Sequence, residues 1–358
     1  MAATIRDIKE QTGLSLATIS KYLNGGNVLP ENRVKIEAAI KELHYEVNEI
    51  ARGLVTNRTR TVGVLAYSVE SIFNGTLLRH IGNSLRKAGY GLMICDSCDD
   101  LKIEAENVNF LLGKKVDGII ALPVSTKTDS LKMAKKAKVP VVLLDRPSQD
   151  AGFDCVRIDN CRAAYQAVRF LQESGHKKIG IVCSLTEYTG RERYRGYKEA
   201  MEEAGCELRE EYCAAGTHSI EFGFEGMSRL LSLEERPTAV FMTNYEVALG
   251  AVMALNKTKL HCPEDISLMG FDDLIMSHVI HPRLHMVVQP MKEMGEKAAE
   301  LLLSRIESRE QEMPMEIVLG TRISEGDSVA VIDAERHENN EILRRHALAG
   351  SVLQEPVK

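Results

Sequence analysis

Residues 4–24, TIRDIKEQTGLSLATISKYLN, contain two short helical patterns separated by a glycine. In the first pattern, apolar residues recur at helical spacing until Gly13, whose permissive backbone allows a sharp turn. Ser15 can then cap a second helix that begins at Leu16 and ends at Leu23, just before Asn-Gly-Gly. Two short helices joined by such a turn predict a helix-turn-helix.

Residues 1–46 as a whole predict a small domain of three short helices with a thin core. The apolar residues expected in that core are Ile5, Ile8 and Ile19 and, from a third helix after Pro30, Val34, Ala38, Ile40 and Leu43. The exposed face of the second helix would carry Leu16, Ala17, Ser20 and Lys21, which a recognition helix places in the major groove of DNA. A helical bundle that binds no nucleic acid is the alternative, because this helix has only one cation.

Charge and composition place these helices at the start of an acidic, globular chain. The 358 residues have a net charge of −6, but residues 1–60 hold nine Lys and Arg against seven Asp and Glu, which favours an anionic partner for this part. We find neither a signal peptide nor an apolar run of the roughly 18 residues that would cross a bilayer, so we expect a cytoplasmic protein. The eight cysteines are then expected to be reduced thiols, including the isolated CxxC of Cys95 and Cys98.

From Thr61 onward, short apolar runs alternate with helical patterns. The runs are TVGVLAY (61–67), YGLMICD (90–96), VDGIIALP (116–123), VPVVLLD (139–145), KKIGIVC (177–183), TAVFMT (238–243), DISLMGFD (265–272) and HMVVQP (285–290). Alternating strands and helices predict parallel sheets covered on both faces, and the length of this region favours two α/β lobes. Ligands of such sheets bind beyond the carboxyl ends of the strands, which directs attention to the residues just after each run.

Residues 48–60, NEIARGLVTNRTR, are expected to link the helical part to the α/β part. Ile50, Ala51 and Leu54 could form one apolar face of a short helix, but its length and internal glycine make such a helix marginal on its own. From about Ala330 the chain is polar, and its leucines are spaced too irregularly to predict a coiled coil.

The chain from about residue 3 to residue 328 resembles the LacI/GalR family of bacterial transcription regulators. Besides the N-terminal TIRDIKEQTGLS, the resemblance rests on NEIARGL (48–54), DRP (145–147), IDN (158–160), SGHKKIG (174–180), RYRGY (193–197) and PEDISLMGFDD (263–273). It implies a small all-α helix-turn-helix headpiece and an α/β periplasmic-binding-protein-like (type I) core of two doubly wound lobes.

The resemblance also implies domain boundaries. The headpiece would comprise 1–46, a hinge helix or linker 47–60, the effector-binding and dimerisation core 61–328, and a tail 329–358. Within the core, lobe 1 would comprise about 61–160 and 290–320, and lobe 2 about 161–289 and 321–328.

The function implied is that of a repressor that binds a pseudo-palindromic operator in double-stranded DNA as a homodimer. Its implied DNA contacts are Thr4 and Ser15 at phosphates, Leu16, Ala17, Ser20, Lys21 and Asn24 on the recognition helix, and Ala51 and Leu54 in the hinge. Because Leu16 and Ala17 are apolar, we expect them to contact thymine methyl groups, while Ser20 and Lys21 make the polar contacts. Leu54 would wedge into a base step of the minor groove, unless it docks on a lobe.

A small-molecule effector, a sugar or sugar derivative, would bind between the lobes. The residues that match effector-binding positions of the family are Phe73, Asp145, Thr189, Arg193, His218, Asn244 and Asp272. Each has a structural alternative, such as core packing for Phe73, helix capping for Asp272 and a surface loop for His218. The cluster of Arg191, Arg193 and Arg195 favours a sugar acid or sugar phosphate over a neutral sugar. The alternative for Arg191 and Arg195 is a solvated, charged helix face.

Two other classes of protein were weighed. A sugar-binding protein of a transport system would share the core fold, but the N-terminal helix-turn-helix argues against it. An enzyme is not expected, because the chain lacks the G-x-S-x-G, G-x-G-x-x-G, Walker and H-E-x-x-H motifs. We also expect no cofactor and no metal.

Overall fold

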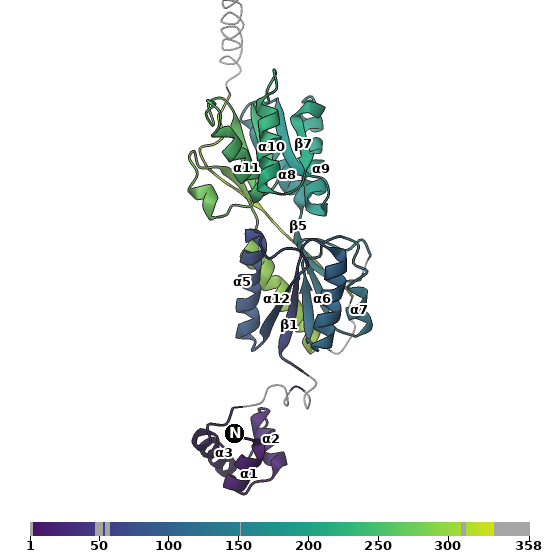
Figure 1. The fold of residues 1–358 in the computed structure, drawn as a ribbon, viewed down its shortest axis with the longest axis vertical. Coiled ribbons are helices and arrows are strands. Elements are labelled where there is room, and N and C mark those ends of the chain that lie inside the picture. Colours follow the sequence, from purple (N-terminus) through teal and green to yellow (C-terminus); the bar gives the residue numbers. More distant parts are fainter. Residues whose placement is uncertain (1–2, 47–52, 54–57, 151, 309–312, 333–358) are drawn as a thin grey trace, which may run out of the picture.

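The computed structural model describes residues 3–46, 53, 58–150, 152–308 and 313–332, which form a helical headpiece and two α/β lobes (Figure 1). The headpiece consists of α1 (Ile5–Thr12), α2 (Leu16–Leu23) and α3 (Pro30–Glu42). Gly13 follows α1 with a φ of 69°, the left-handed conformation that lets the chain turn into α2 without steric strain. The helix-turn-helix predicted from residues 4–24 is present.

The headpiece core contains Ile8, Ile19, Ile36 and Ala39, with Ile5, Ile40 and Leu43 packed around them. The predicted buried face of α3 was therefore partly wrong. Val34 is 67% exposed and Ala38 is also exposed. The inward positions are Ile36, Ala39, Ile40 and Leu43, at i, i+3, i+4 and i+7, whereas Val34 lies about half a turn away from this stripe.

Lobe 1 is built on a six-stranded sheet of order β11-β5-β4-β3-β1-β2 in which all strands are parallel. Its strands are β1 (Thr61–Ala66), β2 (Gly91–Asp96), β3 (Gly118–Ala121), β4 (Val141–Leu144), β5 (Asp154–Ile158) and β11 (Glu316–Leu319). Its helices are α5 (Ile72–Lys87), α6 (Leu101–Gly113), α7 (Lys132–Lys136) and α12 (Met291–Glu307). α5 and α12 pack on one face of the sheet, and α6 and α7 on the other.

Lobe 2 has a second six-stranded sheet, of order β12-β10-β9-β8-β6-β7, parallel except for the edge strand β12. Its strands are β6 (Ile179–Ser184), β7 (Cys213–Gly216), β8 (Ala239–Met242), β9 (Ser267–Phe271), β10 (His285–Val288) and β12 (Arg322–Ser324). Its helices are α8 (Asn160–Glu173), α9 (Tyr188–Glu203), η1 (Glu210–Tyr212), α10 (Ile220–Leu231), α11 (Tyr245–Leu255) and η2 (Ile275–His278).

The chain passes between the lobes three times, after β5, after β10 and after β11. Each predicted apolar run contains a strand, namely β1 to β4, β6, β8, β9 and β10, and most of these strands are fully buried. The carboxyl ends of both sheets point toward the junction of the lobes, because residues that follow strands of both sheets line one cleft. Figure 1 shows this for lobe 1, whose strands run from the side of the headpiece toward lobe 2. This arrangement positions the site described below.

None of the described helices is long and apolar enough to cross a membrane. The eight cysteines are free thiols, and in the CxxC pair Cys95 is buried at the end of β2 while Cys98 is exposed in the following loop. Among the described residues, no cluster of His, Cys, Asp and Glu has the geometry to hold a metal ion.

Candidate functional site

The second headpiece helix presents one face to solvent. Leu16 is 40% exposed, and Ala17, Lys21 and Asn24 are exposed as well, while the opposite side of α2 packs into the headpiece core. Ser20 is half-buried, and its carbonyl accepts a hydrogen bond from Asn24 Nδ2 at 2.9 Å. The five side chains expected to contact DNA thus share one side of the helix.

The two residues expected at phosphates each cap a helix. Thr4 precedes α1, and its N–H and hydroxyl donate to Asp7 Oδ2 at 2.7 and 2.8 Å. Ser15 precedes α2, and its Oγ accepts from the N–H of Thr18 at 3.1 Å. Both caps are exposed at helix N-termini, where free N–H groups favour anions. The hinge candidates Ala51 and Leu54 lie outside the described residues.

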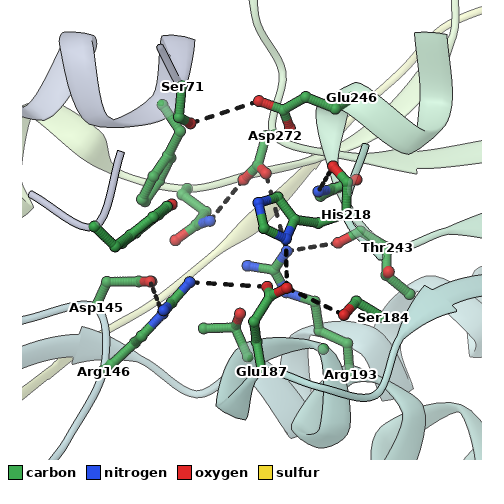
Figure 2. Close-up of a pocket in the computed structure, with 16 residues that line it drawn as sticks. Ser71, Asp145, Arg146, Ser184, Glu187, Arg193, His218, Thr243, Glu246 and Asp272 are labelled. Carbon is green, nitrogen blue, oxygen red and sulfur yellow. Dashed lines mark hydrogen bonds and ion pairs between the residues drawn. The ribbon is translucent and has the colours of Figure 1, made fainter. Parts of the chain in front are cut away.

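A cleft lies between the two lobes (Figure 2). All seven residues expected to bind an effector line it: Phe73, Asp145, Thr189, Arg193, His218, Asn244 and Asp272. Lobe 1 contributes residues that follow β1 and β4, and lobe 2 contributes residues that follow β6, β8 and β9. The cleft therefore has the position expected of a small-molecule site in this type of sheet.

Arg193, on α9, is 5% exposed and is held from several sides. Its guanidinium lies 3.7 Å from the centroid of the Phe271 ring, Nε donates to Asn160 Oδ1 at 2.8 Å, and Nη1 donates to the carbonyl of Thr243 at 2.5 Å. Nη1 is also 3.9 Å from Asp272 Oδ2. Nη2 has no hydrogen-bond partner among the described residues, so one nitrogen of the fixed fork is available to a ligand.

Arg146 and Asp145 form the corresponding pair in lobe 1. The Arg146 guanidinium stacks 4.0 Å from the centroid of the Tyr67 ring, and Nη1 donates to the carbonyls of Pro123 and Val124 at 3.2 and 3.0 Å. Its Nε lies 3.9 Å from Asp145 Oδ2, which is too far for a hydrogen bond. Burial raises the pKa of Asp145 to about 6, against the opposing charge of Arg146.

Two buried acceptors in the cleft have no donor within the described residues. They are Oδ1 of Asp145 and Oε1 of Gln289, whose Nε2 donates to Asp272 Oδ1 at 2.6 Å. Burial also raises the pKa of Asp272, which the charge of Arg193 counteracts. Because buried polar groups are nearly always hydrogen-bonded in folded proteins, these acceptors indicate a place for a hydrogen-bond donor.

The same two aspartates adopt a strained backbone. Asp145 and Asp272 each have a φ of 71°, the left-handed region that residues other than glycine seldom occupy. Each follows a strand, β4 in lobe 1 and β9 in lobe 2. Strain of this kind concentrates at ligand sites, where the surrounding structure holds it in place.

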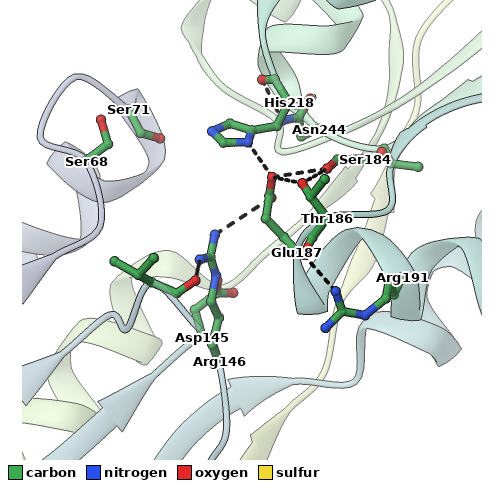
Figure 3. A network of polar contacts seen from close by, with 12 residues as sticks. Ser68, Ser71, Asp145, Arg146, Ser184, Thr186, Glu187, Arg191, His218 and Asn244 are labelled. Carbon is green, nitrogen blue, oxygen red and sulfur yellow. Dashed lines mark hydrogen bonds and ion pairs between the residues drawn. The ribbon is translucent and has the colours of Figure 1, made fainter. Parts of the chain in front are cut away.

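Glu187 and His218 form a third polar pair, shown in Figure 3. Nδ1 of His218 is hydrogen-bonded to Glu187 Oε1, which also accepts from Ser184 Oγ at 3.1 Å. Glu187 Oε2 lies 3.7 Å from Arg146 Nη2, so this network reaches from lobe 2 to lobe 1. The hydrogen bond to Glu187 raises the pKa of His218 despite its partial burial. Burial acts to raise the pKa of Glu187, but His218 and Arg146 together hold it below its usual value.

The remaining three expected residues shape the cleft in different ways. Phe73 is 6% exposed, belonging both to the lobe 1 core and to the cleft wall. Thr189 is buried in the first turn of α9. Asn244 caps α11 through Oδ1 and donates from Nδ2 to the carbonyl of His218 at 3.2 Å, so its amide is largely occupied.

Of the three neighbouring arginines only Arg193 enters the cleft, and Arg191 and Arg195 lie on the solvated helix face that was the alternative for them. Arg195 is exposed and paired with Glu192 and Glu199, and Arg191 donates to the carbonyl of Thr186 on the surface. Successive arginines two residues apart on a helix point in different directions, so only Arg193 faces inward. The cleft instead contains four carboxylates, on Asp145, Glu187, Glu246 and Asp272, against two arginines and one histidine.

Several residues that line the cleft were not predicted as site residues. They are Tyr67, Ser71, Arg146, Ser184, Glu187, Gly190, Thr243, Glu246 and Gln289. Tyr67, Thr243 and Gln289 directly follow β1, β8 and β10, so the rule of strand ends could have found them. Glu187 and Glu246 lie at the beginnings of α9 and α11, and no pattern in the sequence distinguishes them from carboxylates that merely favour a helix N-terminus.

The comparisons with known proteins extend over both parts of the chain. Residues 168–329 match a family model described as a periplasmic binding protein-like domain. The HTH-type transcriptional repressor PurR of Pectobacterium carotovorum is 34% identical over 314 residues, which cover 87% of this chain and 92% of that protein.

Solved structures with the same fold include a LacI family transcriptional regulator from Enterococcus faecium with bound ribose. It is 29% identical, has a TM-score of 0.69, and the match covers 76% of this chain and 100% of that one. The lac repressor dimer bound to operator matches 92% of this chain and 100% of its own with a TM-score of 0.83, and its 22% identity shows a shared fold.

A helix-turn-helix headpiece on a two-lobed core with a polar cleft defines a class of protein, the transcription regulator controlled by a small molecule. The 34% identity to the repressor PurR over 87% of this chain narrows this class to one family. The chain belongs to the LacI/GalR family of transcriptional regulators. It is a repressor and not an enzyme.

Proposed function

We propose that this repressor binds a pseudo-palindromic operator as a homodimer in the cytoplasm, and that each subunit places α2 in the major groove of one half-site. The exposed face of α2, with Leu16 and Ala17 beside Ser20 and Lys21, supports this arrangement. A single cation on α2 gives each headpiece little affinity of its own, so two linked headpieces add their binding energies. Ala51 and Leu54 are proposed to contact the minor groove between the half-sites, with Leu54 as the wedge.

The proposed effector is a neutral polyhydroxyl compound, such as a sugar, in the cleft between the lobes. The observation that carries this choice is the excess of carboxylates in the cleft, together with the unpartnered acceptors on Asp145 and Gln289. Hydroxyl groups donate to such acceptors, whereas a carboxylate or phosphate would be repelled by them. The charge of each arginine is opposed by a carboxylate at 3.9 Å, so the carboxylates remain in excess. Nε of Arg146 and Nη2 of Arg193 have no hydrogen-bond partner in the described residues and can donate to hydroxyl oxygens.

Selection of binding sites from a random duplex pool, with the full-length protein at moderate salt, tests the DNA part of the proposal. We expect an inverted repeat whose centre contains a flexible pyrimidine–purine step. If no sequence is enriched, either alone or with added cell metabolites, the proposed operator binding is wrong.

The selected operator then allows a screen for the effector. Neutral sugars, sugar acids and sugar phosphates would be compared by their effect on operator affinity and by calorimetry. The proposal predicts that a neutral sugar is bound at least about tenfold more tightly than its phosphate or acid. Tighter binding of the acid or the phosphate would refute the effector class while leaving the repressor function intact.

A further inference from the structure

The lower edge of lobe 1, where its strands begin, carries an unusual group of cations. All six strands of this sheet are parallel, so the segments that precede them meet at one edge. Arg58 and Arg60 precede β1, and Arg86 and Lys87 end the helix that leads to β2. All four side chains are exposed.

The next two segments continue this pattern. Lys114 and Lys115 lie between α6 and β3. Lys135 and Lys136 end α7, and Lys138 lies between α7 and β4. These five lysines are also exposed, and none of them forms an ion pair with an acidic side chain in the described part of the chain. Lys135 donates only to the carbonyl of Gly152, at 3.3 Å.

Few acidic residues accompany these cations at the edge. Asp117 is engaged by the backbone, because its carboxylate accepts the N–H groups of Thr59 and Arg60 at 2.8 Å each. Four further acidic side chains lie near the beginnings of these strands in the described residues. Glu307 ends α12, Asp150 lies in the loop before β5, and Asp154 and Glu316 begin β5 and β11. Of these, Asp150 is paired with Lys132 and Asp154 with Arg305. The nine cations outnumber these acidic residues, so the edge is positive on a chain whose net charge is −6.

Lobe 2 provides an internal comparison, because it has the same architecture. Cations at a helix C-terminus can simply favour the helix dipole, and this would apply equally to both lobes. In lobe 2, however, α8 and α9 have no basic residue in the last turn. At this edge Lys178 and Arg209 are paired with Glu235, whereas the exposed Lys177, Lys257 and Lys259 form no ion pair within the described residues. The fold alone does not require the positive edge of lobe 1.

The edge also lies at the place where DNA would approach. The chain enters lobe 1 at Arg58–Thr61, directly after the segment that connects it to the headpiece, and Figure 1 shows this edge facing the headpiece. Within the headpiece, α2 carries only Lys21 as a cation. A second positive surface next to the headpiece would supply the affinity for phosphates that the recognition helix lacks.

We propose that the lower edge of lobe 1 is a second DNA-binding surface, which contacts phosphates of the operator duplex without regard to sequence. This inference rests on the proposed operator binding. The core, and not only the headpiece, would then contribute to the affinity for DNA and to the rate of association, and this contribution would depend on salt.

The test compares two full-length triple variants, K114Q/K136Q/K138Q at the edge of lobe 1 and K177Q/K257Q/K259Q at the equivalent edge of lobe 2. Both remove three exposed charges, and thermal unfolding establishes that each variant is folded. Binding to the selected operator and to an unrelated duplex is measured over a range of salt concentrations. For the lobe 1 variant we expect affinity to fall at least about fivefold near 100 mM salt, with a salt slope smaller by at least about 1.

The loss should be similar on both duplexes, because phosphate contacts carry no sequence information. Wild-type affinity and slope in the lobe 1 variant, or an equal loss in the lobe 2 variant, would overturn the inference. If the selection has yielded no operator, the unrelated duplex still tests this edge, so failure of the operator proposal is distinguished from failure of the second surface.

Discussion

Replacing Asp145 with Asn should make the ligand-free protein more stable and its effector binding weaker. Asp145 is 3% exposed, and burial raises its pKa from the ordinary 3.8 to about 6. Keeping this carboxylate ionised at pH 7 therefore costs about 3 kcal/mol relative to the unfolded chain, at about 1.4 kcal/mol per pKa unit. Asn has nearly the same shape, tolerates the φ of 71°, and carries no charge.

The sign of the pH dependence follows from the raised pKa. The contribution of Asp145 to stability is fully present below its ordinary pKa of 3.8 and is lost as the pH rises through about 6. The advantage of D145N over the wild type should thus be up to about 3 kcal/mol at pH 7 and fall to roughly half of that at pH 5. At about 2–4 °C per kcal/mol, the variant should melt several degrees higher at pH 7.

Thermal and urea unfolding of the ligand-free protein at both pH values measure this difference, and calorimetry measures the affinity for the effector. D150N, on the surface beside Lys132, is the matched control and should change neither quantity appreciably. Effector affinity of D145N should fall at least about tenfold, because a charged acceptor of a ligand hydroxyl is lost. A D145N protein that is less stable than the wild type at pH 7, or equally stable at both pH values, would refute the argument.

Three further predictions concern single side chains. Arg193→Lys keeps the charge but loses the fork stacked on Phe271, so effector affinity in calorimetry should fall at least about tenfold while operator affinity without effector stays unchanged; unchanged effector affinity would remove Arg193 from the site. Ser15→Ala removes the N-cap of α2 and should lower headpiece stability by about 1 kcal/mol, measured as lost amide-exchange protection in α2, with the exposed Ser232→Ala as control. Glu187→Gln should lower the raised pKa of His218 in an NMR titration. In the wild type, protonated His218 stabilises the fold below its ordinary pKa, and this stabilisation is lost as the pH rises through the raised pKa. The stabilisation should vanish in Glu187→Gln. If the pKa of His218 does not change in this variant, Glu187 is not the cause of the shift.

The strands that the sequence predicts share a physical property that the missed ones lack. The predicted strands are continuous apolar runs, which is the pattern of strands buried on both faces. β5 (DCVRI) and β11 (EIVL) contain charged residues, β7 (CAAG) has no β-branched residue, and β12 (RIS) has three residues. β11, β7 and β12 are edge strands that need less burial, and β5, next to β11, is recognisable only from its pairing with β4 and β11.

The cleft could be predicted in part for a similar reason. Residues at strand ends, such as Asp145 and Asp272, are placed by the sheet, so local sequence and family motifs suffice to locate them. The inward position of Arg193 was expected, but the charge of the cleft could not be predicted, because it depends on carboxylates that two helix beginnings bring together. The rotation of α9 about its axis sends Arg191 and Arg195 to the surface, and this rotation is fixed by tertiary packing, for example of Tyr197 in the lobe core.

Within the described residues, the polar contacts that join the lobes across the cleft are long, which would allow an effector to act on the relative position of the lobes. Arg146 lies 3.7 Å from Glu187, and Ser71 Oγ lies 3.5 Å from Glu246. Both contacts are at or beyond the limit of a hydrogen bond, so they add little to closure. A ligand that donates hydroxyls to Asp145 in lobe 1 and to Asp272 in lobe 2 would favour the closed arrangement through contacts available only there.

Movement of lobe 1 would then reach the linker directly. The last linker residues are fixed to this lobe, because the N–H groups of Thr59 and Arg60 both donate to the carboxylate of Asp117. A rotation of lobe 1 therefore carries the start of the linker, and the basic edge around it, as one body. Effector binding would change the spacing of two headpieces and the position of the positive edge together, which couples the cleft to DNA through a single rigid element. If that is so, Asp117→Asn should reduce the effect of the effector on operator affinity while leaving effector affinity, measured by calorimetry, unchanged; an unchanged effect on operator affinity would contradict this route.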